Sequence, residues 1–123
     1  MLQLKCNISL FILEYIKIIN FDWIKGEINM LKNKEELIKQ NIQEVINSWD
    51  PIGLMNICPE DEYEPEINEI VEFVICNKNI NKILLSEEIR KIFNFYFTSI
   101  YNSINEVEED VASKILEKCK NIL

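Results

Sequence analysis

The chain has 123 residues, of which 48% are hydrophobic and 28% are charged, and its formal net charge is −8. This length fits one domain with a hydrophobic core, and the composition is that of neither a disordered chain nor a membrane protein. The negative charge argues against binding to nucleic acids and to anionic membranes, which attract lysine and arginine. It would attract a basic protein partner, but an acidic surface also keeps a small protein soluble without any partner.

The first predicted element is a helix over residues 8–23. Its apolar residues recur at helical spacing: Ile8, Phe11, Ile12, Tyr15, Ile19 and Trp23. Lys25 in the last turn and Gly26 after it form a predicted C-terminal cap. The run carries Glu14 and Lys17, is too short to span a bilayer, and precedes no small-residue cleavage site. It therefore predicts neither a membrane helix nor a signal peptide.

Residues 1–29 have two interpretations. Met30 and the charged residues after it resemble a natural N-terminus, so residues 1–29 are either an upstream extension with a start assigned too early or a native segment. In both cases we expect an N-terminal helical extension over residues 1–29. Residues 30–123 are then expected to form a single helical-bundle domain.

The second predicted helix begins at Asn33, with Glu36 three residues later as a capping box, and it ends at Trp49. Its apolar face consists of Leu31, Ile38, Ile42, Val45, Ile46 and Trp49. The stretch from Trp49 to Glu64 is not periodic and contains prolines, which predicts an ordered loop. Pro65 then opens a third helix whose acidic first turn suits the helix dipole. The apolar stripe of that helix is Ile67, Ile70, Val71 and Val74.

An asparagine-rich connector over residues 77–81 follows, and we expect Ile80, Ile83 and Leu84 to hold it against the core. Ser86 predicts the N-cap of a fourth helix. The inward face of that helix is predicted to be Ile89, Ile92, Phe93, Tyr96, Ile100 and Ile104. Phe95 points to the opposite side, where residues 1–29 are expected to cover it.

Asn105 and Glu108 predict the N-terminal cap of the last helix. Its stripe is Val107, Val111, Ile115, Cys119 and Ile122. No strand-like alternation competes with these helical patterns. The predicted fold class is therefore all-α, a small bundle of four to five helices with an ordered, proline-rich loop between helices.

Residue types that many enzymes need are missing. Without histidine the chain cannot form a Ser-His-Asp or Cys-His nucleophile, and its two glycines cannot build a glycine-rich phosphate loop. The four cysteines, Cys6, Cys58, Cys76 and Cys119, show no CxxC spacing, so they predict thiols in a reducing cytoplasm rather than a zinc site. We expect no enzymatic activity, no bound metal and no cofactor.

The most informative segment runs from Trp49 to Glu66. Asp50 can accept hydrogen bonds from the amides that follow it, Pro51 restricts φ, and Gly53 permits a left-handed conformation. Trp49 ends the preceding helix with a large apolar side chain, and further along several carboxylates surround one tyrosine. The candidate binding residues are Trp49, Asp50, Pro51, Gly53, Asp61, Glu62, Tyr63 and Glu64.

The two motifs of this segment are WDPIGL at residues 49–54 and PEDEYEPEI at residues 59–67. Together they resemble the YugE-like family of small bacterial domains of unknown function, which is domain-of-unknown-function family 1871. The resemblance extends more weakly to Ile92, Phe93 and residues 111–116, and it spans about residues 30–120. It implies an all-helical domain and supplies no catalytic residues. Similar segments also resemble those of small immunity partners of bacterial toxins.

Three interpretations of the motif pair stay open. It is architectural if Trp49 plugs the core and Asp50 shapes the turn. It is a recognition patch if Asp50, Asp61, Glu62 and Tyr63 contact a basic protein partner, such as a toxin that an immunity protein neutralises. It is a site for Ca²⁺ or Mg²⁺, or for a carboxylate-based hydrolase, if the carboxylates converge, although their spacing matches no EF-hand. We expect a non-enzymatic protein-binding module.

Overall fold

The computed structural model describes residues 22–57 and 62–123, and every regular element within them is an α-helix. The four helices are α2 (Asp22–Trp49), α3 (Glu64–Cys76), α4 (Lys82–Tyr96) and α5 (Asn105–Cys119). This confirms the prediction of a small all-α bundle. Most of the helix predicted over residues 8–23 lies outside the described residues, as does Pro59 of the predicted proline-rich loop.

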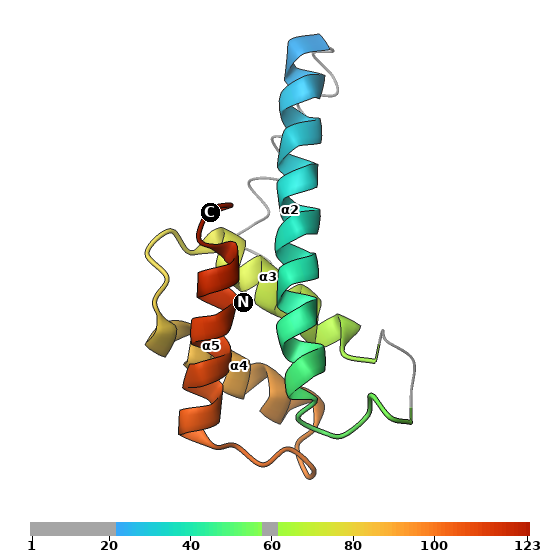
Figure 1. The fold of residues 1–123 in the computed structure, drawn as a ribbon, viewed down its shortest axis with the longest axis vertical. Coiled ribbons are helices and arrows are strands. Elements are labelled where there is room, and N and C mark those ends of the chain that lie inside the picture. The colour runs from blue at the N-terminus through green and yellow to red at the C-terminus, as the bar shows by residue number, and fades with distance from the viewer. Residues whose placement is uncertain (1–21, 58–61) are drawn as a thin grey trace.

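The four helices close into a ring in which each packs mainly against two others. Helix α2 contacts α3 and α5, and α4 lies against the same two helices on the opposite side. Figure 1 shows that α2 is much the longest element and that its N-terminal part rises beyond the other three. From residue 25 onward, where side-chain burial is described, Ile38 is the first buried residue of α2, whereas Met30 is 62% exposed. Only the second half of α2 therefore belongs to the bundle.

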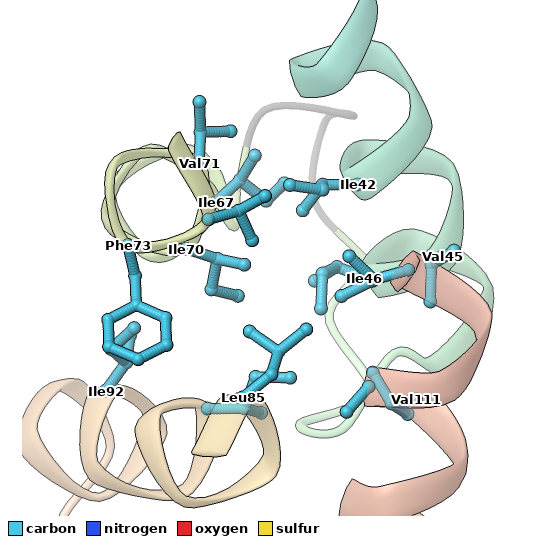
Figure 2. Packing of buried hydrophobic residues seen from close by; sticks show 14 of the residues in the cluster. Ile42, Val45, Ile46, Ile67, Ile70, Val71, Phe73, Leu85, Ile92 and Val111 are labelled. Carbon is cyan, nitrogen blue, oxygen red and sulfur yellow. The ribbon is translucent and has the colours of Figure 1, made fainter. Parts of the chain in front are cut away.

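One hydrophobic core joins all four helices. In Figure 2, Ile67 and Ile70 of α3 face Ile42 and Ile46 of α2, while Phe73 of α3 lies over α4. The predicted stripes are confirmed at the positions that are buried within the described residues: Ile38, Ile42, Val45, Ile46, Ile67, Ile70, Val71, Val74, Ile89, Ile92, Phe93, Val111, Ile115 and Cys119. Burial of this aliphatic surface is the main source of stability for a bundle of this size.

The predicted break between the first two helices is wrong. Helix α2 is continuous over 28 residues, so Gly26 is no C-terminal cap and Asn33 is no N-terminal cap. Gly26 has no positive φ, which a glycine cap requires. The residues between the two positions include good helix formers such as Leu31, and a helix continues through isolated cap residues when nothing else ends it. The helix also crosses residues 29 and 30 without interruption.

The predicted cap of α4 is also wrong. Asn81 is the N-cap, and its Oδ1 accepts a hydrogen bond of 2.9 Å from the Leu84 amide. Ser86 is buried one turn later and donates to the Ile83 carbonyl at 2.8 Å. Ile83 and Leu84 are therefore exposed members of the first helical turn, and only Ile80 packs against the core as expected.

Two further expectations fail near the loop between α4 and α5. Helix α4 ends at Tyr96, so Ile100 and Ile104 fall in that loop, and the predicted inward positions Tyr96, Ile100 and Ile104 are all exposed. The predicted cap of α5 is wrong, because Ile104 is the N-cap and Asn105 is already the first residue of the helix. The carboxylate of Glu108 is buried and binds Arg90 instead. Phe95 is 77% exposed, and most of the segment expected to cover it lies outside the described residues.

The described cysteines differ from one another. Cys119 is a buried free thiol, and burial raises its pKa. Cys76 is disulfide-bonded, which departs from the expectation that all four cysteines are thiols. In the described part of the chain, no helix combines the length and the apolar character that crossing a bilayer needs.

Glu66 is an unusual charged residue in the first turn of α3. Its side chain is only 3% exposed, and its Oε2 atom has no hydrogen-bond partner within the described residues. Burial, and to a smaller extent the charges of Glu69 and Glu62, raise the pKa of the carboxyl. The folded protein therefore holds this proton more tightly than the unfolded chain does.

We expect Glu66→Gln to raise the free energy of unfolding at pH 7. A raised pKa in the folded state means that stability is lost as the pH rises through that pKa, because the buried carboxyl must then ionise. Glutamine stays neutral, so the gain should shrink as the pH falls toward 4. Urea unfolding of both proteins between pH 4 and pH 8 measures this difference, and Glu87→Gln, on an exposed side chain of α4, is the control. An equal gain at both pH values would contradict the prediction.

Candidate functional site

The first motif forms a tight turn directly after α2. Asp50 adopts φ of 47°, a left-handed conformation that aspartate tolerates better than most residues. Its amide donates to the Ile46 carbonyl at 2.8 Å, and its carbonyl accepts from the Gly53 amide at 3.1 Å. Gly53 has φ of 79°, which a side chain would disfavour. The Asp-Pro-Ile-Gly sequence thus reverses the chain in four residues.

The side chain of Asp50 fastens this turn to the second motif. Its Oδ1 atom accepts hydrogen bonds from the amides of Leu54 at 2.9 Å and Met55 at 3.3 Å, and from the Tyr63 hydroxyl at 2.6 Å. The Tyr63 hydroxyl in turn accepts a hydrogen bond of 3.1 Å from the Ile52 amide. One carboxylate oxygen and one phenol oxygen therefore hold both ends of the loop between α2 and α3.

Tyr63 is fully buried at the start of α3. Burial raises the pKa of its hydroxyl to about 12, and the hydrogen bond to Asp50 adds to the shift. The phenol therefore stays protonated and donates to the carboxylate. Its ring meets Phe93 and Phe97 edge-on, at centroid distances of 6.0 and 6.3 Å.

Trp49 packs against the same Phe93 ring. Its indole contacts Phe93 and Tyr101 edge-on, at centroid distances of 5.2 and 6.0 Å. The side chain is half-buried, and its ring nitrogen makes no hydrogen bond to the described residues. These rings form one aromatic cluster, which joins α2, the start of α3, α4 and the loop before α5. Its members are Trp49, Tyr63, Phe93, Phe97 and Tyr101.

A buried polar network beside the aromatic cluster was not predicted. The carboxylate of Glu108 is fully buried and accepts hydrogen bonds from Arg90 Nε at 2.9 Å, from Ser103 Oγ at 2.8 Å and from the Tyr101 hydroxyl. Burial, and then the Glu108 carboxylate, raise the pKa of Tyr101. Arg90 also binds Asn105 at 2.5 Å. Arg90 is the only arginine in a lysine-rich chain. Its presence was the one sequence feature that could have indicated this network, because arginine suits buried, multiply bonded ion pairs better than lysine does.

The other candidate residues lie around the turn. Pro51 is half-buried within it, and Glu62 is exposed before α3. Glu64 is exposed and pairs with Lys39 of α2 at 2.9 Å. Asp61 lies outside the described residues. Asp50 and Tyr63 thus make their described contacts within the chain, as the architectural interpretation of the motif expects.

A groove of about 570 Å³ lies between the end of α2 and the length of α5, and Trp49 forms part of its floor. The rest of the floor is aliphatic: Val45 comes from α2, and Val107 and Val111 come from α5. Ser48 of α2 lines one side and is exposed. The groove is open to solvent and is mostly apolar at its base.

The edges of the groove are charged. Lys118 of α5 pairs with Glu44 of α2 at 2.8 Å, and Lys114 pairs with Asp110 at 3.0 Å. Glu117 also lines the groove, and in residues 22–57 and 62–123 its carboxylate has no ion-pair partner. The two lysines are already neutralised, so the charge left over at the edge is negative.

No three carboxylate or cysteine side chains gather closely enough to hold a metal ion in the part of the chain that the structure describes. The described carboxylates of the motif pair have different partners and do not converge on one point. Asp50 binds amides and a hydroxyl, and Glu64 pairs with a lysine.

Comparison with known proteins gives the family and nothing beyond it. A family model described as a domain of unknown function, DUF1871, matches residues 41–122. The chain belongs to this family, which confirms the resemblance inferred from the motifs. The match begins within α2 and includes both motifs and helices α3 to α5. No curated protein matches the chain, and no solved structure matches it.

We expect Asp50→Ala to lower the free energy of unfolding by about 2–4 kcal/mol, because it leaves three donors without their acceptor and puts alanine in a left-handed conformation. Asp50→Asn is the matched control. Asparagine keeps an oxygen at the same place and tolerates this φ, so the loss should be about 1 kcal/mol. Urea unfolding measures both values. Equal stability of the alanine variant and the wild type would contradict this role.

Tyr63→Phe should remove both the hydroxyl hydrogen bonds and a specific pH dependence. Since the pKa of Tyr63 is raised from its ordinary value of 10 to about 12, this tyrosine contributes stability that is fully present below pH 10 and is lost between pH 10 and 12. The difference in free energy of unfolding between wild type and variant should therefore shrink over that interval. Denaturant titrations at pH 8, 10, 11 and 12 test this, and a constant difference would contradict it.

Proposed function

We propose that this member of the DUF1871 family is a non-enzymatic protein-binding module whose partner is basic. The observation that carries the proposal is the position of Trp49, whose half-buried indole lies on the floor of a groove with excess negative charge at its edge. A cytoplasmic location is part of the proposal, although the disulfide at Cys76 is the observation that argues against a reducing compartment.

The motif supports this proposal because it leaves the indole of Trp49 accessible at the groove. Asp50 and Tyr63 satisfy one another and the amides of the turn, so they position Trp49 rather than reach outward. The indole N–H keeps its hydrogen bond available. Tryptophan is enriched among residues that contribute most to binding energy, because it offers a large apolar surface together with one donor.

Charge supports the same kind of partner. The chain carries a net charge of −8. Within the groove, the two lysines are already paired, which leaves the negative charge of Glu117. Such a field accelerates encounter with a basic protein and disfavours acidic ones. The exposed Glu62 adds to the acidic surface near the motif.

An immunity-like role is a special case of this proposal. A basic toxin, such as a nuclease, carries the positive surface that binds its acidic substrate, and an acidic protein with an apolar anchor can cover that surface. The support for this role is the charge of the chain and the resemblance of its motifs.

Affinity capture of the tagged protein from a lysate of its source tests the proposal. We expect a stoichiometric basic protein at low salt that dissociates at high salt. Ser48→Phe should weaken capture at least about tenfold, because its ring fills the groove without removing an internal contact, whereas Ser113→Phe on the exposed surface of α5 should not.

A charge reversal provides a second comparison in the same experiment. Glu117→Lys and Glu87→Lys change the net charge equally, but only the first lies in the groove. Weaker capture by Glu117→Lys alone supports the groove. Equal capture by all variants, or an acidic partner that resists salt, would overturn the proposal.

A further inference from the structure

We infer that the groove between α2 and α5 receives a basic amphipathic helix of the partner, which lies along α5 as an added helix of the bundle. This inference rests on the proposed function and specifies the partner's chemistry. It has three grounds, which are the shape of the groove, the arrangement of its apolar floor and its unpaired charge.

The groove is elongated along α5. The α5 residues that line it begin at Val107 and end at Lys118, and they recur every three or four residues. They therefore lie on one face of the helix over three turns, a length of about 16 Å at 1.5 Å per residue. Helix α2 contributes only the last turn and a half, from Glu44 to Trp49. The groove therefore has a wall of three turns on α5 and a shorter wall on α2, and these dimensions suit a third helix that lies along α5.

The apolar floor consists of two rows of side chains, one from each helix, between which one face of a third helix can pack. Val107 and Val111 are one turn apart on α5, and Val45 and Trp49 are one turn apart on α2. A helix that lies between these rows can place residues spaced by three or four positions between the four side chains, as ridges pack into grooves. An extended peptide has no comparable fit, because the described residues contain no strand to which it could add.

Charge distinguishes a basic helix from an acidic one. The acidic residues lining the groove are Glu44, Asp110 and Glu117, against the bases Lys114 and Lys118. Two of the acids are paired with the two lysines, so Glu117 is the carboxylate that can accept a lysine or arginine of the incoming helix without breaking an existing ion pair. An acidic helix would meet this carboxylate and a net charge of −8.

The fluorescence of Trp49 reports occupation of the groove directly. The chain has two tryptophans, so a Trp23→Phe variant leaves Trp49 as the only one. The probe is an 18-residue peptide of leucine and lysine with leucines at helical spacing. A peptide of the same composition in scrambled order and a leucine–glutamate peptide with the same spacing are the controls.

We expect the basic amphipathic peptide to shift Trp49 emission to shorter wavelength and to saturate at micromolar concentration. The scrambled and acidic peptides should bind at least about tenfold more weakly. In the same background, Ser48→Phe should weaken binding about tenfold and Glu117→Lys should weaken it several-fold, while Ser113→Phe and Glu87→Lys should leave it unchanged.

Three results would overturn the inference: no response of Trp49 to the basic amphipathic peptide, an equal response to the scrambled or the acidic peptide, or binding that Ser48→Phe leaves intact. The peptide titration and the capture experiment test different statements, so one can give a negative result when the other does not. A basic partner captured by the wild type and lost with Ser48→Phe, combined with a silent peptide titration, would preserve the proposed function and exclude the basic helix as the occupant.

Discussion

The hydrogen bond between Asp50 and Tyr63 is the contact on which the arrangement of the motif region depends. It joins the end of α2 to the beginning of α3, and the same carboxylate oxygen satisfies two amides of the intervening turn. Tyr63 can be fully buried only because its hydroxyl has these partners, since an unsatisfied buried hydroxyl is costly. The rings of Tyr63 and Trp49 then both pack edge-on against Phe93. A local polar contact therefore determines where the indole lies.

The sequence predicted the helices with strong apolar periodicity and the residues that they bury, because burial depends on spacing that a single chain shows directly. It misplaced caps at Asn33, Ser86 and Glu108. Cap residues act only where a helix ends, and whether a helix ends depends on packing against other elements. Asn81, which does cap α4, lies in an asparagine-rich stretch whose composition predicts a connector. Short polar side chains favour both settings, so the pattern alone could not separate them.

The sequence predicted residues of the motif region, but not which of their side chains point into the core and which line a groove. The turn chemistry of Asp50 and Gly53 and the acidic surroundings of Tyr63 predict a site, and the structure brings these residues together. That Tyr63 points inward follows from long-range packing against α4, which no local motif encodes. The groove beside Trp49 depends on α5, which begins more than fifty residues later in the chain, so no local sequence signal could indicate it. The network of Glu108 and Arg90 has the same long-range origin.

The projection of α2 beyond the bundle gives one helix two different kinds of stability. From Ile38 onward its amides lie behind a core shared by four helices, so their exchange with solvent requires opening of the whole domain. Over the turn that carries Met30 and Leu31 the side chains are exposed and take no part in that core. Exchange of the amides in this turn therefore does not require opening of the four-helix core. One continuous helix thus combines a part whose amide exchange reports unfolding of the whole domain with a part whose amide exchange does not.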